Sequence, residues 1–178
     1  MVRTRNAREE DLPVIGQLAG QLVRMHHAWD PLRWMMPAGV EEGYARFFAS
    51  QLDDPDTVIL VAEDALGEVA GYAYAALEPR SWADLREACG KLHDVFVAPP
   101  VRRKGIGKRL AREAMARLRD LGAPRVVLTS AWQNQAAHAL FRSLGFRETM
   151  IEMAKEMDGG SSTSSSLCGD GSGAKITA

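Results

Sequence analysis

The sequence predicts an α/β protein with a mixed central sheet of about six strands flanked by four helices. Three observations lead to this fold class. Apolar, β-branched runs alternate with amphipathic stretches along most of the chain. Two of these runs, 57–63 and 68–77, are joined by a short turn that contains glycine, which is typical of an antiparallel hairpin. A strand, a glycine-containing turn and a long amphipathic stretch then follow one another from residue 92 to residue 121, and this order suits an anion-binding unit.

The bulk properties of the chain indicate one ordinary globular domain. Its 178 residues are enough for a substantial core, and the formal net charge of −1 implies no general attraction to nucleic acid or membranes. No apolar run approaches the ~20 residues of a membrane-spanning helix. The charged N-terminus lacks the core of a signal peptide. Two cysteines, Cys89 and Cys168, suit neither a disulfide framework nor a metal cluster. We therefore expect a cytoplasmic protein without a metal.

The first third of the chain predicts a short strand and two helices. Residues 2–7 suit the strand, and Asp11 is placed to cap the first helix, with Pro13 tolerated in its first turn. An apolar stripe at helical spacing continues this helix; its members are Ile15, Leu18, Leu22, Val23 and His26. The pattern breaks at 27–37, and 40–52 reads as a second, shorter helix.

The remaining elements follow the hairpin of 57–77. Residues 80–90 form a long connection in which we expect one helical turn, and 92–97 is the next strand. A long helix ends at Gly122-Ala123-Pro124, and 126–130 is a strand. Asn134 caps a helix that runs to Leu144, with Gly145 as its stop, and 146–157 is a final strand.

The last 21 residues, 158–178, have a different composition. Every residue from Ser161 to Ser166 is Ser or Thr, glycine is frequent and apolar side chains are scarce. Such a segment buries too little surface to offset its ordering entropy. We therefore expect a folded domain over 1–157 and a flexible Ser/Gly-rich tail over 158–178.

The turn before the long helix has the features of a diphosphate site. Helix-start N–H groups have no intrahelical acceptor, and the positive end of the macrodipole adds to their attraction for anions. Gly105 and Gly107 lack a Cβ, so a ligand can approach the backbone closely. Between residues 102 and 119 eight basic residues stand against the single acid Glu113; they are Arg102, Arg103, Lys104, Lys108, Arg109, Arg112, Arg117 and Arg119. A phosphate-bearing ligand is the simplest explanation, although exposed basic residues late in a helix are more often a solvated face.

Two common phosphate motifs do not fit this turn. A P-loop requires Ser or Thr after Gly107-Lys108, where Arg109 stands, and a dinucleotide fingerprint requires a third glycine at Leu110. What remains, R-x-x-G-x-G after a V-x-V strand, resembles motif A of the GNAT acetyltransferases. The pattern Asn134-x-x-Ala137-x-x-x-Phe141-x-x-x-Gly145-Phe146 resembles their motif B, and the order of elements matches their fold over about residues 1–157.

The resemblance implies that the protein moves an acetyl group from acetyl-CoA directly to an amine. In this family the strand of motif A is splayed from its parallel neighbour, and free backbone groups near Val95, Phe96 and Val97 bind the arm of CoA. The turn contributes the remaining contacts, from Arg102, Arg103, Lys104, Gly105, Ile106, Gly107 and Lys108. Asn134 and Phe141 complete the expected CoA site by resemblance, although Asn134 is equally explained as a helix cap.

His93 is the candidate base. Leu92–Val97 (LHDVFV) resembles a hexad of diamine and polyamine acetyltransferases in which a glutamate, here replaced by His93, faces the acceptor amine. A neutral imidazole with its ordinary pKa of ~6.5 is a suitable base at neutral pH, but an inert histidine at a strand edge is as plausible. A regular strand would turn His93 to the same side as Val95 and Asp94 to the other.

Phe141 departs from the family pattern, because the tyrosine common there can protonate the leaving thiolate and phenylalanine cannot. The acceptor cleft of the family lies near the connection that here carries Trp29, Asp30, Trp34, Met35 and Met36, and near the loop of Trp82. We expect an N-acetyltransferase for a small-molecule amine. The alternatives are a protein or peptide N-acetyltransferase and a non-catalytic acyl-CoA sensor. The family resemblance also allows a homodimer.

Overall fold

The computed structural model of the chain describes residues 2–157, and the tail predicted for 158–178 lies outside the described residues. A single mixed sheet forms the centre, with strand order β1-β2-β3-β4-β5. Neighbouring strands are antiparallel except for β4 and β5, which are parallel. The strands are β1 (Arg3–Asn6), β2 (Thr57–Glu63), β3 (Val69–Glu78), β4 (Cys89–Val97) and β5 (Val126–Val127). This topology confirms the predicted α/β class with a mixed sheet.

The predicted hairpin is present between β2 and β3. Thr57 pairs with Ala76, and the ladder continues to the turn at residues 64–68. In that turn the Asp64 carboxylate accepts hydrogen bonds from the N–H groups of Leu66 and Glu68, at 2.8 and 3.1 Å. Side-chain acceptance of this kind fixes a tight turn and so sets the register of both strands.

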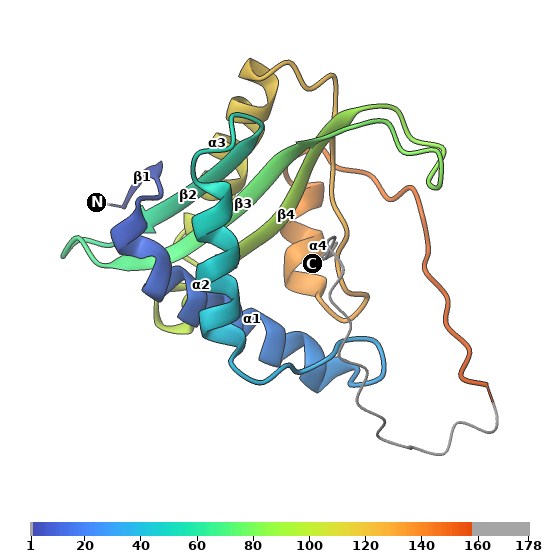
Figure 1. The fold of residues 1–178 in the computed structure, drawn as a ribbon, viewed down its shortest axis with the longest axis horizontal. Coiled ribbons are helices and arrows are strands. Elements are labelled where there is room, and N and C mark those ends of the chain that lie inside the picture. Colours follow the sequence, from blue (N-terminus) through green and yellow to red (C-terminus); the bar gives the residue numbers. More distant parts are fainter. Residues whose placement is uncertain (1, 158–178) are drawn as a thin grey trace.

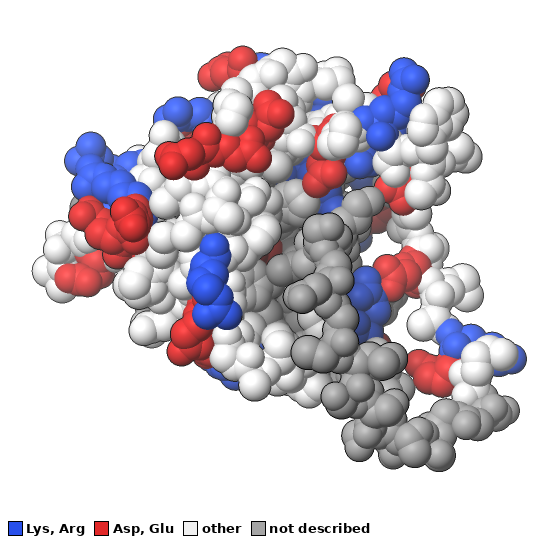
Figure 2. Space-filling view, in the orientation of Figure 1, with Lys and Arg blue, Asp and Glu red and all other residues white. Residues whose placement is uncertain are grey.

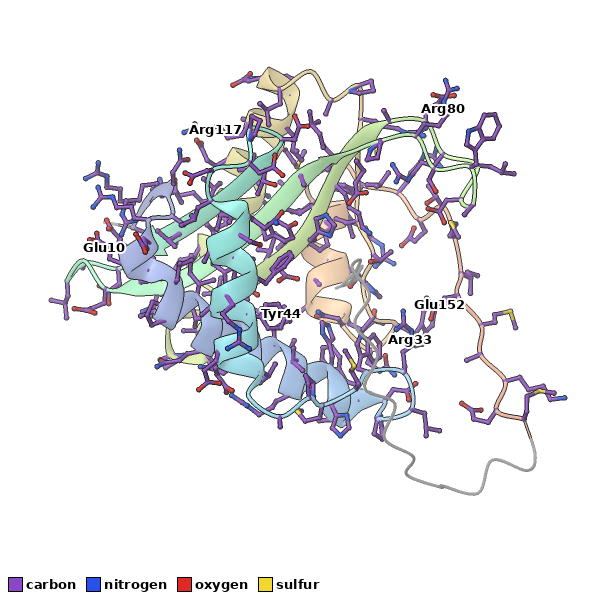
Figure 3. All side chains as sticks on the ribbon, viewed as in Figure 1. Glu10, Arg33, Tyr44, Arg80, Arg117 and Glu152 are labelled. Atoms are coloured by element: carbon purple, nitrogen blue, oxygen red, sulfur yellow. The ribbon has the colours of Figure 1, made fainter. Side chains whose placement is uncertain are left out.

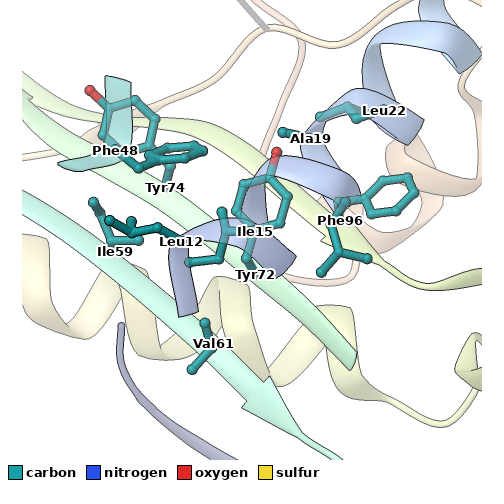
Figure 4. Close-up of a cluster of buried hydrophobic side chains, with 11 residues drawn as sticks. Leu12, Ile15, Ala19, Leu22, Phe48, Ile59, Val61, Tyr72, Tyr74 and Phe96 are labelled. Carbon is teal, nitrogen blue, oxygen red and sulfur yellow. The ribbon is translucent and has the colours of Figure 1, made fainter. Parts of the chain in front are cut away.

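Helices α1 (Leu12–Trp29) and α2 (Val40–Gln51) cover one face of the sheet (Figure 1). Between these helices and the sheet lies an aromatic core, part of which is drawn in Figure 4. Phe48 and Tyr72 are fully buried there, and their rings meet edge to face with centroids 5.7 Å apart. Burial of each such side chain contributes about 2–3 kcal/mol, so these contacts dock the helix pair on the sheet.

Helix α3 (Ile106–Asp120) packs on the opposite face, against β2, β3 and β4. Its buried stripe follows the predicted spacing through Ile106, Leu110, Ala114 and Leu118. The facing positions of β3 are Ala73 and Ala75, which leave room for the leucines of the helix. The helix begins beside the end of β4, so its N-terminus is held rigidly near that strand.

Asp11 has a different role from the predicted helix cap. It precedes α1, but its side chain makes no cap hydrogen bond to that helix. Its carboxylate instead accepts two hydrogen bonds from the Arg5 guanidinium, at 2.6 and 2.9 Å, and Arg5 also contacts Glu63 at 2.6 Å. The arginine holds the pKa of the buried Asp11 carboxyl below its usual value. This cluster ties the start of α1 to β1 and β2.

Three predictions about the later chain are wrong in part. The sheet has five strands in the described residues, because 146–157 is extended but pairs with no strand. Strand β5 ends at Val127, not at Ser130. The connection between β3 and β4 contains a bridge from Ser81 to Arg86 where we expected a helical turn. Apolar side chains on the 146–157 segment stay exposed, among them Met150, Ile151, Met153 and Met157.

The fourth helix, α4 (Gln135–Arg142), lies beside β4 at the end of the sheet (Figure 1). All four predicted helices are therefore present. Arg33, in the connection between α1 and α2, contacts Glu152 of the extended C-terminal segment (Figure 3). Across residues 2–157, no helix combines the length and apolar character needed to cross a bilayer.

Candidate functional site

Strands β4 and β5 diverge after two residue pairs. Gly90 pairs with Val126 and Lys91 with Val127, and no later pair follows in the described chain. Strand β4 stays paired with β3 up to Val97, but its other edge, toward β5, has no strand partner from Leu92 onward in the described residues. An unpaired strand edge offers backbone N–H and C=O groups to a ligand. The splayed parallel pair that the family resemblance implied is therefore present.

A cleft occupies this gap. Strand β4 contributes residues 92–95 to its wall, and the segment after β5 contributes residues 128–130. Helix α4 closes one side, and α1 contributes Leu22 and His26. The residues from α4 and its cap are Asn134, Ala137, Leu140 and Phe141. The predicted residues His93, Val95, Asn134 and Phe141, far apart in sequence, thus meet in one cleft.

The turn before α3 leaves its amide groups available. In the described part of the chain, the backbone N–H groups of residues 103–108 donate no hydrogen bond to another protein group. Arg103 and Gly105 have φ values of 65° and 79°, in the left-handed region that turns successive N–H groups toward one side. Residues 102–105 are exposed. The predicted anion site is therefore open and unoccupied by protein groups.

Gly107 connects this anion site to the cleft. A Cβ placed on Gly107 would lie 3.6 Å from Val97 Cγ2, 3.6 Å from Leu140 Cδ2 and 3.9 Å from Val95 Cγ1. The absent side chain therefore points toward the unpaired edge of β4. The first turn of α3 therefore lies directly beside residues of β4 and α4, and the glycine leaves the backbone open to close approach.

The basic residues of the turn differ in their partners. Arg102 donates from Nε to the carbonyl oxygen of Val97 at 2.8 Å, and its guanidinium lies over the Phe96 ring. It ties the turn to the end of β4. Arg103 and Lys104 are exposed and make no ion pair with a described residue. Ile106 directs its side chain into the core, so only its backbone can serve the turn. On the face seen in Figure 2, acidic and basic side chains are interspersed and form no single-sign groove.

A β-bulge at His93 changes the orientation predicted for this strand. Tyr74 pairs with Asp94 and the next residue, Ala75, pairs with Leu92, so His93 is an extra residue on β4. Leu92 therefore packs on the α3 side with Val95, whereas His93 stacks on Tyr74, which belongs to the aromatic core on the α1 side. The prediction that His93 faces the same way as Val95 is wrong, because the bulge breaks the alternation.

His93 is enclosed by three neighbours. Its ring stacks on Tyr74 with centroids 4.7 Å apart and an interplanar angle of 22°. Nε2 lies 3.1 Å from Oε1 of Glu78, but the geometry is not that of a hydrogen bond, and neither ring nitrogen has a hydrogen-bond partner among the described residues. Burial, assisted by Lys91, lowers the pKa of His93 to about 4, against the opposing effect of Glu78. The imidazole is therefore neutral at physiological pH, and it is a weaker base than the ordinary imidazole expected from the sequence.

Asp94 also faces the cleft. It is only 5% exposed, and its Oδ2 accepts a hydrogen bond of 2.9 Å from the Tyr72 hydroxyl. Burial raises the pKa of this carboxyl to about 6, while the Tyr72 hydrogen bond acts in the opposite direction. The carboxylate present at neutral pH is thus a negative charge held at the wall of the cleft.

The motif B residues occupy the opposite wall. Asn134 caps α4, since its side-chain oxygen accepts a 3.1 Å hydrogen bond from the N–H of Ala137. The cap prediction is confirmed. Phe141 is half-buried and meets the ring of Phe146 edge to face, with centroids 5.6 Å apart. It supplies an apolar surface to the cleft and no proton.

The aromatic residues predicted to line an acceptor pocket separate into two groups. His26, at the end of the cleft, stacks on Trp34 at 5.1 Å and meets Trp29 edge-on at 5.3 Å. Trp82 lies on the exposed β3–β4 connection and is 77% exposed. Met35 is equally exposed and does not line the cleft. Trp29 and Trp34 thus stand near the cleft, through their contacts with His26.

Two residues next to His93 were missed by sequence reasoning. Tyr74 and Glu78 lie on the same face of β3 as Tyr72, two and six residues further along the strand. That alternation was visible in the sequence. Their proximity to His93 was not, because it depends on the register of β3 against β4 and on the bulge.

Comparison with known proteins agrees with this geometry. A sequence model described as the acetyltransferase (GNAT) family matches residues 24–146. The chain is 37% identical to the mycothiol acetyltransferase of Pseudarthrobacter chlorophenolicus over 87 residues, which are 49% of this chain and 26% of that protein. It is 37% identical to the L-methionine sulfoximine/L-methionine sulfone acetyltransferase of Pseudomonas aeruginosa over 89 residues, 49% of each chain. The chain thus spans about a quarter and about half of these relatives.

Solved structures share the fold. A mutant of the BH1408 protein from Bacillus halodurans superposes with a TM-score of 0.75 at 19% identity, covering 87% of this chain and 99% of that one. AAC(6')-Iy in complex with the bisubstrate analogue CoA-S-monomethyl-acetylneamine gives a TM-score of 0.70 at 17% identity, covering 88% and 98%. These likenesses concern the fold alone. With the family match over more than half of its length, the chain belongs to the acetyltransferase (GNAT) family.

Proposed function

We propose that this protein transfers the acetyl group of acetyl-CoA directly to a primary amine of a small molecule. The observation that carries the proposal is the junction at Gly107, where free amides of the α3 turn meet the unpaired edge of β4. A ligand that suits both parts has a diphosphate and, joined to it, an extended arm with amide groups. CoA has this composition.

Each part of CoA then has a binding surface of matching chemistry. The amides of residues 105–108 receive the diphosphate, with charge from Arg103, Lys104 and Lys108 and from the anchored Arg102. The backbone from Val95 to Val97 pairs with the arm as a further strand would. Asn134 and Phe141 flank the arm from α4.

Two residues of β4 serve the acceptor. The Asp94 carboxylate attracts a cationic amine into the cleft, and His93 removes its proton, because an ammonium with a pKa of ~10 cannot attack. The free amine attacks the thioester carbonyl carbon, the new C–N bond forms and the C–S bond breaks. The thiolate takes the remaining proton from the acetylated nitrogen through water, since Phe141 supplies none. Both ring nitrogens of His93 are closed to solvent, so the ring receives its proton from the bound acceptor and not from bulk water.

The names of the relatives support a small acceptor. Two of them are named for mycothiol and for L-methionine sulfoximine or L-methionine sulfone. The cleft lined by His26, Asp94 and His93 has a volume of only about 70 Å³, which also suits a single amine better than a peptide.

The test is release of free thiol from acetyl-CoA on addition of a panel of amines, with the product amide identified by mass spectrometry. We expect release with at least one small primary amine and none without an acceptor. Acetylation of peptides alone would favour a peptide N-acetyltransferase. Binding of acetyl-CoA without release under any amine would favour an acyl-CoA sensor, a reading that the absence of a tyrosine at position 141 keeps open.

A cytoplasmic location and a homodimer are further predictions of the same proposal. The first follows from the cysteine content, the second from the family resemblance. Cell fractionation tests the location. Light scattering of the purified full chain tests the dimer.

A further inference from the structure

Glu78, the last residue of β3, has no role in the function proposed above, yet its Oε1 lies 3.1 Å from Nε2 of His93. We propose that Glu78 is a positioning residue: it holds the neutral His93 imidazole in the tautomer with the proton on Nε2 and leaves Nδ1 as the proton acceptor. This inference rests on the proposed function.

The two side chains meet because of the bulge. Glu78 continues the alternation of Tyr72 and Tyr74 on β3, and the extra residue on β4 turns His93 to this same face. The Tyr74 ring lies flat under the imidazole, at 4.7 Å and 22°, so the imidazole plane is fixed by packing. With that plane set, Nε2 is the nitrogen within reach of Glu78 Oε1, at 3.1 Å. Catalytic hydrogen bonds are often misaligned without substrate and straighten when it binds.

The Glu78 carboxylate has a second charged neighbour, Arg86. Oε2 of Glu78 lies 3.9 Å from Nη2 of Arg86, and the Glu78 side chain is only 26% exposed. Arg86 also donates from Nη1 to the buried Cys89 sulfur at 2.7 Å, which fixes the guanidinium at the start of β4. The Arg86 contact is too long for a hydrogen bond, but its charge draws the half-buried Glu78 carboxylate toward the β4 side and so favours one orientation.

Among the described charged and titratable groups around His93, Glu78 is the one that favours an imidazolium at close range. Lys91 on the same strand disfavours it, and burial does so more strongly. Asp94 is adjacent in sequence, but its carboxylate accepts a hydrogen bond from the Tyr72 hydroxyl. His26 of α1 lines the same cleft, and burial lowers its pKa, so this ring is neutral. When His93 takes a proton from the acceptor, Glu78 therefore converts an isolated buried cation into a neutral pair.

The test combines imidazole ¹⁵N NMR with steady-state kinetics on the full-length protein. His93 signals are assigned by their loss in His93→Ala. In the wild type we expect one neutral tautomer with the proton on Nε2. Glu78→Ala should give a tautomer mixture and lower kcat by ~10- to 100-fold with KM within about 2-fold. Glu78→Gln keeps an acceptor oxygen but no charge, so it should retain the tautomer and lower the His93 pKa.

Glu87→Ala is the matched control, because Glu87 lies on the same hairpin, binds exposed Arg80 and does not contact the imidazole. It should leave both the tautomer and kcat unchanged. An unchanged tautomer in Glu78→Ala would overturn the inference, and so would normal kcat in His93→Ala. If Glu78→Ala does not fold, an unshifted His93 pKa in Glu78→Gln overturns it. The NMR readout needs no acceptor, so failure to find an active amine is distinguished from failure of the positioning role.

Discussion

The buried Asp94 carboxylate predicts a specific dependence of stability on pH. Burial raises its pKa from 3.8 to about 6 in the folded protein. Between these values the folded state binds the proton and the unfolded state does not, so the free energy of unfolding falls as pH rises through the window and levels off above about pH 6. A difference of about 2 pKa units corresponds to ~3 kcal/mol of stability that is absent at neutral pH.

Asp94→Asn removes this titration and keeps the volume of the side chain and an oxygen that can accept from Tyr72. The substitution should raise the free energy of unfolding by ~1–3 kcal/mol at about pH 7.5 and by nothing below about pH 4. Urea denaturation followed by tryptophan fluorescence at a series of pH values measures the difference. Asp84→Asn, in the exposed β3–β4 connection, is the control and should change stability by less than ~0.5 kcal/mol.

A stability difference between Asp94→Asn and the wild type that does not vary from about pH 4 to about pH 8 would refute this reasoning. Loss of stability at every pH would also refute it, since that would mean that the ionised carboxylate stabilises the fold.

Three further substitutions test the turn and the N-terminal cluster. Gly105→Ala should cost ~1–2 kcal/mol, because its φ of 79° is strained for any residue with a Cβ; thermal unfolding measures this loss. Gly107→Ala should leave the melting temperature unchanged, since the new Cβ makes ordinary contacts at 3.6 Å, yet weaken CoA binding by at least ~10-fold; a normal affinity would count against the junction. Arg5→Ala should lower the free energy of unfolding by ~3 kcal/mol in urea denaturation, because it leaves the buried Asp11 carboxylate without its cation. Arg8→Ala, which breaks only the exposed ion pair of Arg8 with Glu10, should cost little.

Elements with local signals were predictable. The residues predicted for β2, 57–63, are those observed, because the β-branched run and the glycine turn after it both lie in the sequence itself. The buried stripe of α3 likewise follows its spacing of three and four, and only Leu121, beyond the helix end, is exposed. The open turn at 102–108 was predictable because its glycines and basic residues are contiguous.

Features that depend on pairing were not predictable. The bulge at His93 is a property of two strands and their register, and nothing in the hexad itself marks an extra residue. Residues 146–157 have a strand-like pattern, but a strand also needs a partner edge, and the described sheet ends at β5, which is only two residues long. The roles of Glu78 and Asp94 follow from the same nonlocal contacts and became visible only in the folded chain.

Calorimetric titration of the wild-type protein with CoA and with S-acetylpantetheine, which lacks the diphosphate, tests the central claim most directly. If the free amides and basic side chains of residues 102–108 bind a diphosphate, CoA should bind at one site per chain, more weakly as salt rises, and at least ~100-fold more tightly than S-acetylpantetheine. Equal affinities for the two compounds, or no binding of CoA, would contradict the account.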